Sequence, residues 1–329
     1  MEEIVFIQDD YYEKFDKAFK QLAKDFFNSG ETVCVKLHMG ESKGFFDPEL
    51  ARMAVHVLLN LGCDPFLFDT TTKYRGNRFT PEGYLKTAEK HGFSTERIGC
   101  PIYIDNSFVE QKTEHLNVKI AKRVIDADAV LVLTHFKGHS HSGAGGSIKN
   151  IAMGCVHPDT KAEQHEKANP VVDVNICNAC KVCEELCPFD AMHVDEKAVV
   201  DVKKCFGCGV CINNCPEKAI NPVVEMIEIL MCEATKAVLD KCKKVLYVND
   251  ARNISRFCDC APDPGPKMAN DVGIFMGRDV VAVDKAAIDM TIKENGDVFQ
   301  EVNHKDALVQ VDEGERLGLG KKDYELVRV

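Results

Sequence analysis

Eight of the sixteen cysteines form two copies of one spacing, and this spacing is typical of iron–sulfur proteins. Each copy reads C-x2-C-x2-C-x3-C and is followed by proline. Three cysteines at such short intervals wrap around three corners of a cubane, while the fourth points toward a second cluster. We therefore expect two [4Fe–4S] clusters, one held by Cys177, Cys180, Cys183 and Cys215 and the other by Cys205, Cys208, Cys211 and Cys187.

The repeated spacing is that of bacterial-type two-cluster ferredoxins, and it predicts an electron-conducting module over residues 170–222. Zinc is the alternative, because paired C-x2-C motifs also bind zinc. Zinc ribbons, however, separate their cysteine pairs by a longer loop and lack the third short step and the Cys-Pro ending. The spacing therefore favours iron–sulfur clusters, and such a module implies a redox partner protein as electron donor or acceptor.

A second group of chemically capable residues follows a run of five apolar residues at 129–133, which is typical of a strand buried on both faces. Open α/β sheets bind their ligands where such strands end. Three histidines lie close together there and a fourth follows, and neutral imidazoles are good ligands for transition metals. Solvated loop histidines are the alternative. We expect an additional metal ion with ligands among His135, His139, His141 and His165.

The same segment carries glycines followed by Lys149 and Asn150. It is not a phosphate-binding P-loop, because Ile148 stands where that motif has glycine. Glycine N–H groups beside a lysine still form a binding site for an anion, so we expect a small-molecule or anionic ligand here. Reducing an organic substrate also needs protons, and Lys149 or His139 is the expected catalytic proton donor.

A C-x-C pair, Cys258 and Cys260, lies among turn-forming residues and predicts a loop. Two thiolates so close in sequence are poorly placed for an unstrained disulfide but suit one metal ion. We therefore include both among the expected metal ligands, with incidental thiols as the alternative.

Strand and helix patterns alternate through the first third of the chain, stop at the cysteine segment and resume after it. Such alternation predicts a parallel sheet. The expected fold class is therefore α/β, a mostly parallel sheet with helices on both faces, interrupted by a small ferredoxin-like α+β module. We divide the chain into α/β parts at 1–169 and 223–329, with the module at 170–222 between them. A separate C-terminal domain is disfavoured, because its few strands would make a thin sheet.

Composition narrows the class of protein further. The 329 residues are 45% hydrophobic, enough for a sizeable core. With 52 acidic against 41 basic residues the net charge is −11, which argues against nucleic acid or an anionic membrane as partner. We find no apolar stretch of membrane-spanning length and no secretion signal at the acidic N-terminus. We therefore expect a cytoplasmic protein, whose thiols stay reduced.

Together these motifs resemble the DUF362 family, which is often fused to or interrupted by a two-cluster ferredoxin module. The resemblance is carried by VKLH at 35–38, by KGHSHSGAGGSIKNIAMGC at 137–155, by CDC at 258–260 with DVGIFMGRDVVAVDKAAIDM at 271–290, and by the ending ERLGLGKKDYELV. His38 and Val280 depart from the family pattern, which often has asparagine and proline there. A shorter stretch, SGAGGSIKNIAMG, is similar to the glycine-rich lysine loop of the lactate racemase family. The resemblance to DUF362 implies a pocket made by His139, Lys149, Asn150, Cys258, Cys260 and Asp284.

These observations predict an iron–sulfur oxidoreductase. Electrons would pass through two [4Fe–4S] clusters to a site formed by the loop at 135–150 and the C-x-C pair at 258–260. The alternatives are a non-enzymatic electron carrier, a redox sensor, and a metal-handling or assembly factor that binds at the same loop.

Overall fold

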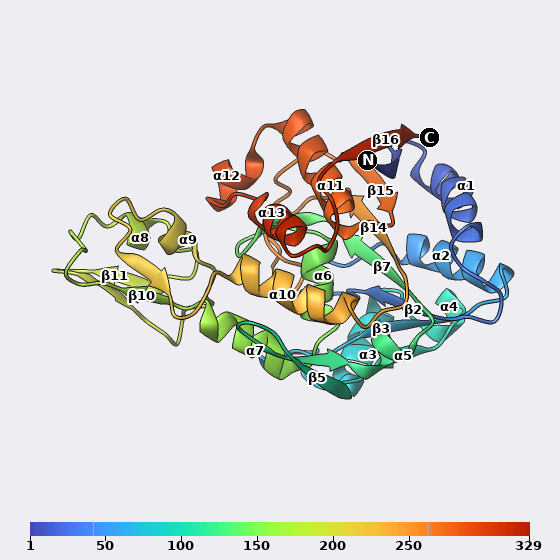
Figure 1. Cartoon of the computed structure of the whole chain (residues 1–329), viewed down its shortest axis with the longest axis horizontal. Coiled ribbons are helices and arrows are strands. Elements are labelled where there is room, and N and C mark those ends of the chain that lie inside the picture. The colour runs from blue at the N-terminus through green and yellow to red at the C-terminus, as the bar shows by residue number, and fades with distance from the viewer. Residues whose placement is uncertain (42, 262) are drawn as a thin grey trace.

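The computed structural model describes residues 1–41, 43–261 and 263–329. An eight-stranded sheet lies across the middle of the molecule (Figure 1). β15 runs antiparallel to both neighbours, and the other neighbouring strands are parallel, which confirms the expected α/β fold with a mostly parallel sheet. In spatial order the strands are β16 (Tyr324–Arg328), β1 (Glu2–Ile7), β15 (Gly273–Gly277), β14 (Val245–Ala251), β7 (Ala129–His135), β2 (Thr32–Leu37), β3 (Asp64–Asp69) and β4 (Ile102–Ile104).

Helices cover both faces of the sheet. β7 shows why, because Val130 and Val132 enter one hydrophobic core while Leu131 and Leu133 enter the other. Alternating burial on two faces explains the unbroken apolar run in the sequence. The first core is covered by α6 (Ser147–Gly154), α10 (Ile227–Leu239), α11 (Val280–Asn295) and α13 (Val309–Arg316), and the second by α1 (Tyr11–Lys24), α2 (Pro48–Asn60), α3 (Pro81–Lys90) and α4 (Thr95–Ile98).

Local sequence signals place several of these elements. Asp47 caps α2 by accepting a 2.9 Å hydrogen bond from the Glu49 N–H. After the module, the apolar run at 272–276 lies largely in β15, whereas the run at 280–283 begins α11 and is capped by Asp279. The smaller elements outside the module are β5 (Phe108–Lys112), β6 (Asn117–Ala121), α5 (Lys122–Asp126), β8 (Lys137–His139), β9 (Gly143–Gly145), α7 (Pro158–Lys167) and α12 (Val298–Asn303).

The cysteine-rich segment forms a lobe that projects from one end of the molecule (Figure 1). Its first and last strands pair antiparallel, so the chain enters and leaves the lobe at one place. Each half carries one cysteine loop, one short helix and one strand of a second hairpin. The elements are β10 (Pro170–Val172), α8 (Val182–Glu185), β11 (Met192–Val194), β12 (Ala198–Val200), α9 (Val210–Asn213) and β13 (Ile220–Pro222).

The two cysteine loops share one backbone conformation. Ala179 and Lys181 in the first loop have φ of 58° and 68°, and Gly207 and Gly209 at the matching positions of the second have 66° and 73°. The repeat in the sequence is therefore also a repeat in the backbone.

No helix in the described part of the chain is both long and apolar enough to cross a lipid bilayer.

Candidate functional site at the carboxyl edge of the sheet

The segment rich in histidine and glycine follows β7 directly, at the carboxyl edge of the parallel strands, as the sequence predicts. It forms the β8–β9 hairpin and then α6. The Gly138 N–H donates a 2.9 Å hydrogen bond to the Ser255 carbonyl. A Cβ at Gly138 would lie 2.6 Å from the Arg256 oxygen, so only glycine allows this close approach. The hairpin is thereby pressed against the loop that carries the C-x-C pair.

The expectation that Cys258 and Cys260 are free thiolates for a metal is wrong in this structure, because the two form a disulfide. Their Cα atoms are 5.2 Å apart, inside the range that disulfides use, since the loop between them bends sharply. Disulfide sulfurs carry no thiolate charge and are not the ligands that a metal site of this kind needs.

Lys149 lies beside this disulfide. Its Nζ donates a 3.0 Å hydrogen bond to the Cys258 Sγ and lies 3.9 Å from the Cys260 Sγ. Burial, together with the nearby Lys137 ammonium, lowers the pKa of Lys149 to about 7. The expected proton donor is thus next to the disulfide and titrates near neutral pH.

Asp259, between the two cysteines, is fully buried and held by two cationic side chains. Its carboxylate accepts hydrogen bonds from His135 Nδ1 at 3.0 Å and pairs with Lys137 Nζ at 2.9 Å. The other ring nitrogen of His135 donates to the Arg252 carbonyl at 3.0 Å. Although burial opposes its charge, the Asp259 carboxylate raises the pKa of His135. With both ring nitrogens donating, His135 is not placed as a metal ligand, contrary to the expectation from its sequence position.

We expected the glycine-rich loop to offer its N–H groups to an external anion. In the structure, an acid of the chain itself accepts hydrogen bonds from N–H groups of this loop. The Asp284 carboxylate of α11 accepts hydrogen bonds from the Ser147 N–H at 2.7 Å and from the Ile148 N–H at 2.9 Å. Asn249 donates a third, at 2.7 Å. A Cβ at Gly146 would lie 2.4 Å from this carboxylate, so the glycine makes room for it. The first turn of α6 is thus occupied by an acid of the chain itself.

Several buried charges at the same edge were not singled out from the sequence. Lys36, only 1% exposed, donates to the Asn150 side chain at 2.7 Å and lies 3.3 Å from Asp69. Burial lowers the pKa of His38 to about 3, and its Nε2 has no hydrogen-bond partner among the described residues. The signal available in the sequence was a lysine inside an otherwise apolar strand, which is rarely buried without a partner.

The other predicted histidines lie between the hairpin and the lobe. His141 Nε2 and His165 Nδ1 donate to the same oxygen, the carbonyl of Phe206, at 3.0 and 2.9 Å. The rings of His139 and His141 are 5.2 Å apart, and those of His141 and His165 are 5.0 Å apart. Phe206 directly follows Cys205, so these histidines contact the second cysteine loop.

The cysteines of the lobe separate into two groups. Cys177, Cys180, Cys183 and Cys215 line one cavity. Burial raises the pKa of the Cys211 thiol, and the three other cysteines proposed for its set add to this effect. Cys183 of the first group adds to it as well, so the two groups lie close together, and the assignment of each cysteine to a cluster stays a prediction.

With this geometry established, the sequence profile of DUF362, a domain of unknown function, matches residues 33–289. The chain belongs to the DUF362 family. The match spans the lobe as well as both flanking parts of the α/β fold, which confirms the family resemblance found in the sequence. A comparison with curated proteins finds no match.

Two solved structures resemble this DUF362 chain. A structural-genomics crystal structure of a protein from Thermotoga maritima is 11% identical, with a TM-score of 0.47, over 90% of this chain and 59% of that one. The lactate racemase apoprotein from Thermoanaerobacterium thermosaccharolyticum is 14% identical, with a TM-score of 0.38, over 75% of this chain and 50% of the other. The chain thus spans 59% of the length of the first structure and 50% of the second, and their activities are not transferred to it.

The residues that the DUF362 resemblance implies as a pocket are only partly brought together. Lys149 contacts the disulfide, and Asn150 contacts Lys36 in the same edge region. Asp284 is instead fully buried behind the loop, where it caps α6. Its role is to position the lysine helix rather than to line a pocket.

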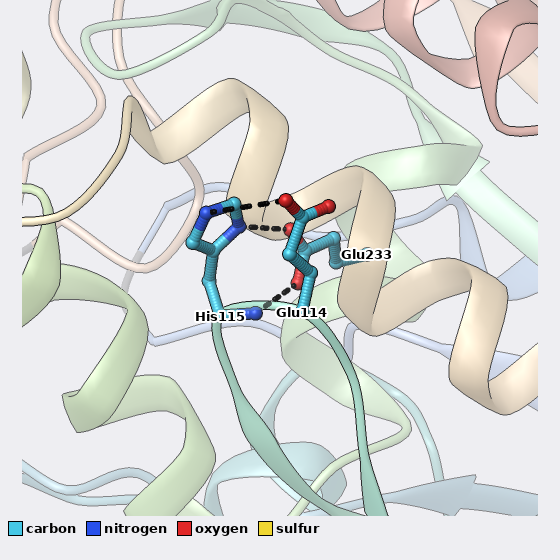
Figure 2. A group of neighbouring side chains, drawn as sticks. All are labelled: Glu114, His115 and Glu233. Carbon is cyan, nitrogen blue, oxygen red and sulfur yellow. Dashed lines mark hydrogen bonds and ion pairs between the residues drawn. The ribbon is translucent and has the colours of Figure 1, made fainter.

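The described residues contain one group of at least three potential metal ligands whose ligand atoms lie within 4.8 Å of one another, and it was not predicted. Glu114, His115 and Glu233 meet beside α10 (Figure 2). Glu233 accepts hydrogen bonds from the Thr113 hydroxyl at 2.8 Å and from the His115 N–H and ring. The buried carboxylate is therefore used to hold the β5–β6 turn on α10. The expected set of His135, His139, His141, His165 and the C-x-C pair is not gathered into one metal site.

Proposed function

We propose that this DUF362 chain is an iron–sulfur oxidoreductase that passes electrons through two [4Fe–4S] clusters to the carboxyl-edge site. The observation that carries the proposal is the Phe206 carbonyl, which accepts hydrogen bonds from both His141 and His165. This one oxygen belongs to a cysteine loop and is bound by residues of the α/β fold. It joins the electron-carrying lobe to the edge where Lys149 lies.

The spacing of the cysteine sulfurs supports clusters over zinc. Four sulfurs around one zinc at about 2.3 Å lie roughly 4 Å apart. Among the described residues, no three cysteine sulfurs lie within 4.8 Å of one another, although four of them surround one cavity. A larger inorganic group fits this wider arrangement. When bound, [4Fe–4S] clusters supply one-electron transfer at each site.

Backbone N–H groups aimed at sulfur support the same assignment. The Ala191 N–H donates to Cys187 Sγ at 3.2 Å, and the Ala219 N–H donates to Cys215 Sγ at 3.3 Å. These are the matching fourth cysteines of the two repeats. Hydrogen bonds to cysteine sulfur stabilise the charge of a ligating thiolate and tune cluster potentials.

The two cysteine sets differ in exposure, which gives the path a direction. Cys180 of the first set is exposed, whereas Cys208 of the second is buried. Buried Lys305, paired with Glu228 in α10, donates a 3.0 Å hydrogen bond to the Cys208 carbonyl. We infer that a redox partner protein docks near the first set and that the second set faces the α/β fold.

The charges of the edge site favour a small anionic substrate. Three of its cations have a carboxylate partner, namely Lys36 with Asp69, Lys137 with Asp259 and Arg78 with Glu41. Lys149 of α6 has none within 4 Å among the described residues, nor has Lys161 of α7, which reaches this edge by donating to the Thr71 carbonyl just after β3. Burial lowers the pKa of each lysine to about 7. Both are partly exposed. An anion reaching them would stabilise their charged forms, and the unpartnered His38 nitrogen offers a further polar contact.

The deciding experiment is anaerobic purification followed by iron and sulfide analysis and electron paramagnetic resonance after reduction. The proposal expects about eight irons per chain, the sum of two four-iron clusters. Lys149→Gln should keep this iron content and lose the reduction of any substrate found by screening small acids. Iron near zero, with stoichiometric zinc instead, would overturn the proposal. Clusters that exchange electrons equally well with partner proteins in wild type and Lys149→Gln, with no acid ever reduced, would favour the carrier alternative.

A further inference from the structure

We propose that the Cys258–Cys260 disulfide is the redox centre at the end of this electron path and that it cycles between disulfide and dithiol. The inference rests on the proposed function, because it needs the lobe to deliver electrons. It goes further by naming the two-electron group that receives them. In this proposal the resting, oxidised form is the disulfide, which is the form that the structure shows.

The loop around the disulfide is held in a way that suits repeated opening and closing of the bond. Asp259, between the two half-cystines, is fully buried and fixed by His135 and Lys137. Cys258 is only 8% exposed, while Cys260 is partly exposed. One sulfur is thus shielded beside Lys149 and the other is accessible to a reaction partner. The fixed peptide between them keeps the sulfurs close after reduction.

Contacts of named residues connect the lobe to this disulfide. Phe206 contacts His141, and the His141 ring packs against His139. Lys137 begins β8 and His139 ends it. Both side chains flank Gly145, because a Cβ placed on that glycine would lie 3.6 Å from His139 Cδ2 and 3.6 Å from Lys137 Cε. Lys137 then pairs with Asp259. The path from the second cysteine loop therefore ends at the residue between the two sulfurs.

The chemistry balances with groups that are present. The disulfide takes up two electrons, which reach it one at a time along the path through the lobe, and the S–S bond breaks. The Lys149 ammonium gives its proton to the Cys258 sulfur, which leaves one thiol, one thiolate and a neutral lysine. The electrons come from a low-potential one-electron carrier protein, and solvent later returns the proton to the lysine. Cationic His135 and Lys137 nearby stabilise the thiolate that forms.

The test uses the full chain, purified anaerobically, before and after reduction with dithionite. Samples are alkylated with iodoacetamide and digested with trypsin, and the peptide at residues 257–267, which holds only these two cysteines, is weighed. We expect no alkyl group on this peptide before reduction and two afterwards. Because dithionite also reduces disulfides directly, Cys187→Ala serves as the second sample. It lacks a ligand of the set that faces the α/β fold, and we expect reduction at least tenfold slower.

Each outcome decides a separate point. Clusters that become reduced while the peptide stays unalkylated would overturn this inference and leave the proposed function intact. Equal reduction rates in wild type and Cys187→Ala would also overturn it, since electrons then bypass the lobe. If the isolated protein has two free thiols here and binds a metal that Cys260→Ser loses, the two cysteines form a metal centre and the inference is overturned. Absence of iron would overturn the proposed function itself. Cys63→Ala removes a buried thiol just before β3, and as the matched control it should behave as wild type.

Discussion

The Nζ of Lys149 lies 3.0 Å from the Sγ of Cys258. In the sequence, Lys149 precedes the cysteine-rich lobe and Cys258 follows it. α6 carries the lysine and a loop after β14 carries the cysteine. Their meeting depends on Gly138, which lets the hairpin approach that loop closely. This contact pairs a cation that titrates near neutral pH with a bond that takes up protons when it is reduced.

The proton donated by Lys149 predicts a pH dependence. Because its pKa is about 7, the lysine is protonated below pH 7 and becomes neutral above it, so reduction of the disulfide should slow as pH rises through 7. Lys149→Gln should slow reduction by roughly 100-fold at pH 6.5, the usual contribution of a general acid, and should flatten the profile. Stopped-flow mixing with reductant followed by alkylation measures the rate. The exposed Lys293→Gln is the control, and an unchanged profile in Lys149→Gln would contradict the assigned role.

Asp284 should prove structural rather than catalytic. Asp284→Ala leaves the N–H groups of Ser147 and Ile148 and the amide of Asn249 without their buried partner. Unsatisfied buried groups cost about 1–3 kcal/mol each, partly relieved by relaxation, so we expect a loss of about 3 kcal/mol. For a chain of 329 residues this corresponds to a fall in Tm of about 4 °C, measurable by anaerobic calorimetry. Glu294→Ala, on the exposed side of the same helix, should change Tm by less than about 1 °C. Equal effects of the two variants would refute this role.

The assignment of the fourth cysteine of each repeat to the opposite cluster is also testable. Cys215→Ala should remove the cluster of the exposed set and reduce the iron content from about eight to about four per chain. The remaining signal should match that of Cys180→Ala, because both variants damage the same set. Cys187→Ala should instead leave a signal matching that of Cys208→Ala. Spectra paired the other way round would show that each repeat holds its own cluster.

Much of the fold followed from periodicity, because burial on two faces leaves an unbroken apolar run such as 129–133, and alternation of such runs with amphipathic helices requires a parallel sheet. The position of the His/Gly/Lys segment followed from the same reasoning, since strands of one direction end at one edge. Local capping signals such as Asp47 were equally readable.

What failed in the sequence reasoning depended on contacts between distant segments. The glycine loop has the composition of an anion site, but Asp284, more than 130 residues away, occupies its N–H groups. The histidines have the spacing of a metal site, yet His135 is used by Asp259, and His141 by a carbonyl of the lobe. Each of these partners is set by tertiary packing, which short-range spacing does not encode.

The unpaired lysines predict binding of small anions that depends on pH. Lys161 donates to the Thr71 carbonyl at 2.6 Å and has no described carboxylate within 4 Å, so an anion should bind when it is protonated and weaken as pH rises through about 7. We expect calorimetric titration with oxalate to give at least tenfold tighter binding at pH 6 than at pH 8.5. Lys161→Gln should lose this difference, while Lys122→Gln, on the exposed surface, should keep it. Equal affinity at both pH values would exclude the lysine as a ligand.

The contact between His115 and Glu233 should make stability depend on pH. The hydrogen bond to Glu233 raises the pKa of His115 above its usual 6.5. Its contribution is therefore fully present below pH 6.5 and is lost as pH rises through the raised value. Wild type should exceed Glu233→Gln in stability by about 1 kcal/mol more at pH 6 than at pH 9, seen as a Tm difference about 1.5 °C larger at the lower pH. Glu114→Gln, whose side chain is exposed, should show little difference at either pH. A Glu233→Gln effect of the same size at both pH values would mean that the carboxylate acts only as an acceptor for the Thr113 hydroxyl and the His115 N–H, and that the imidazole stays neutral.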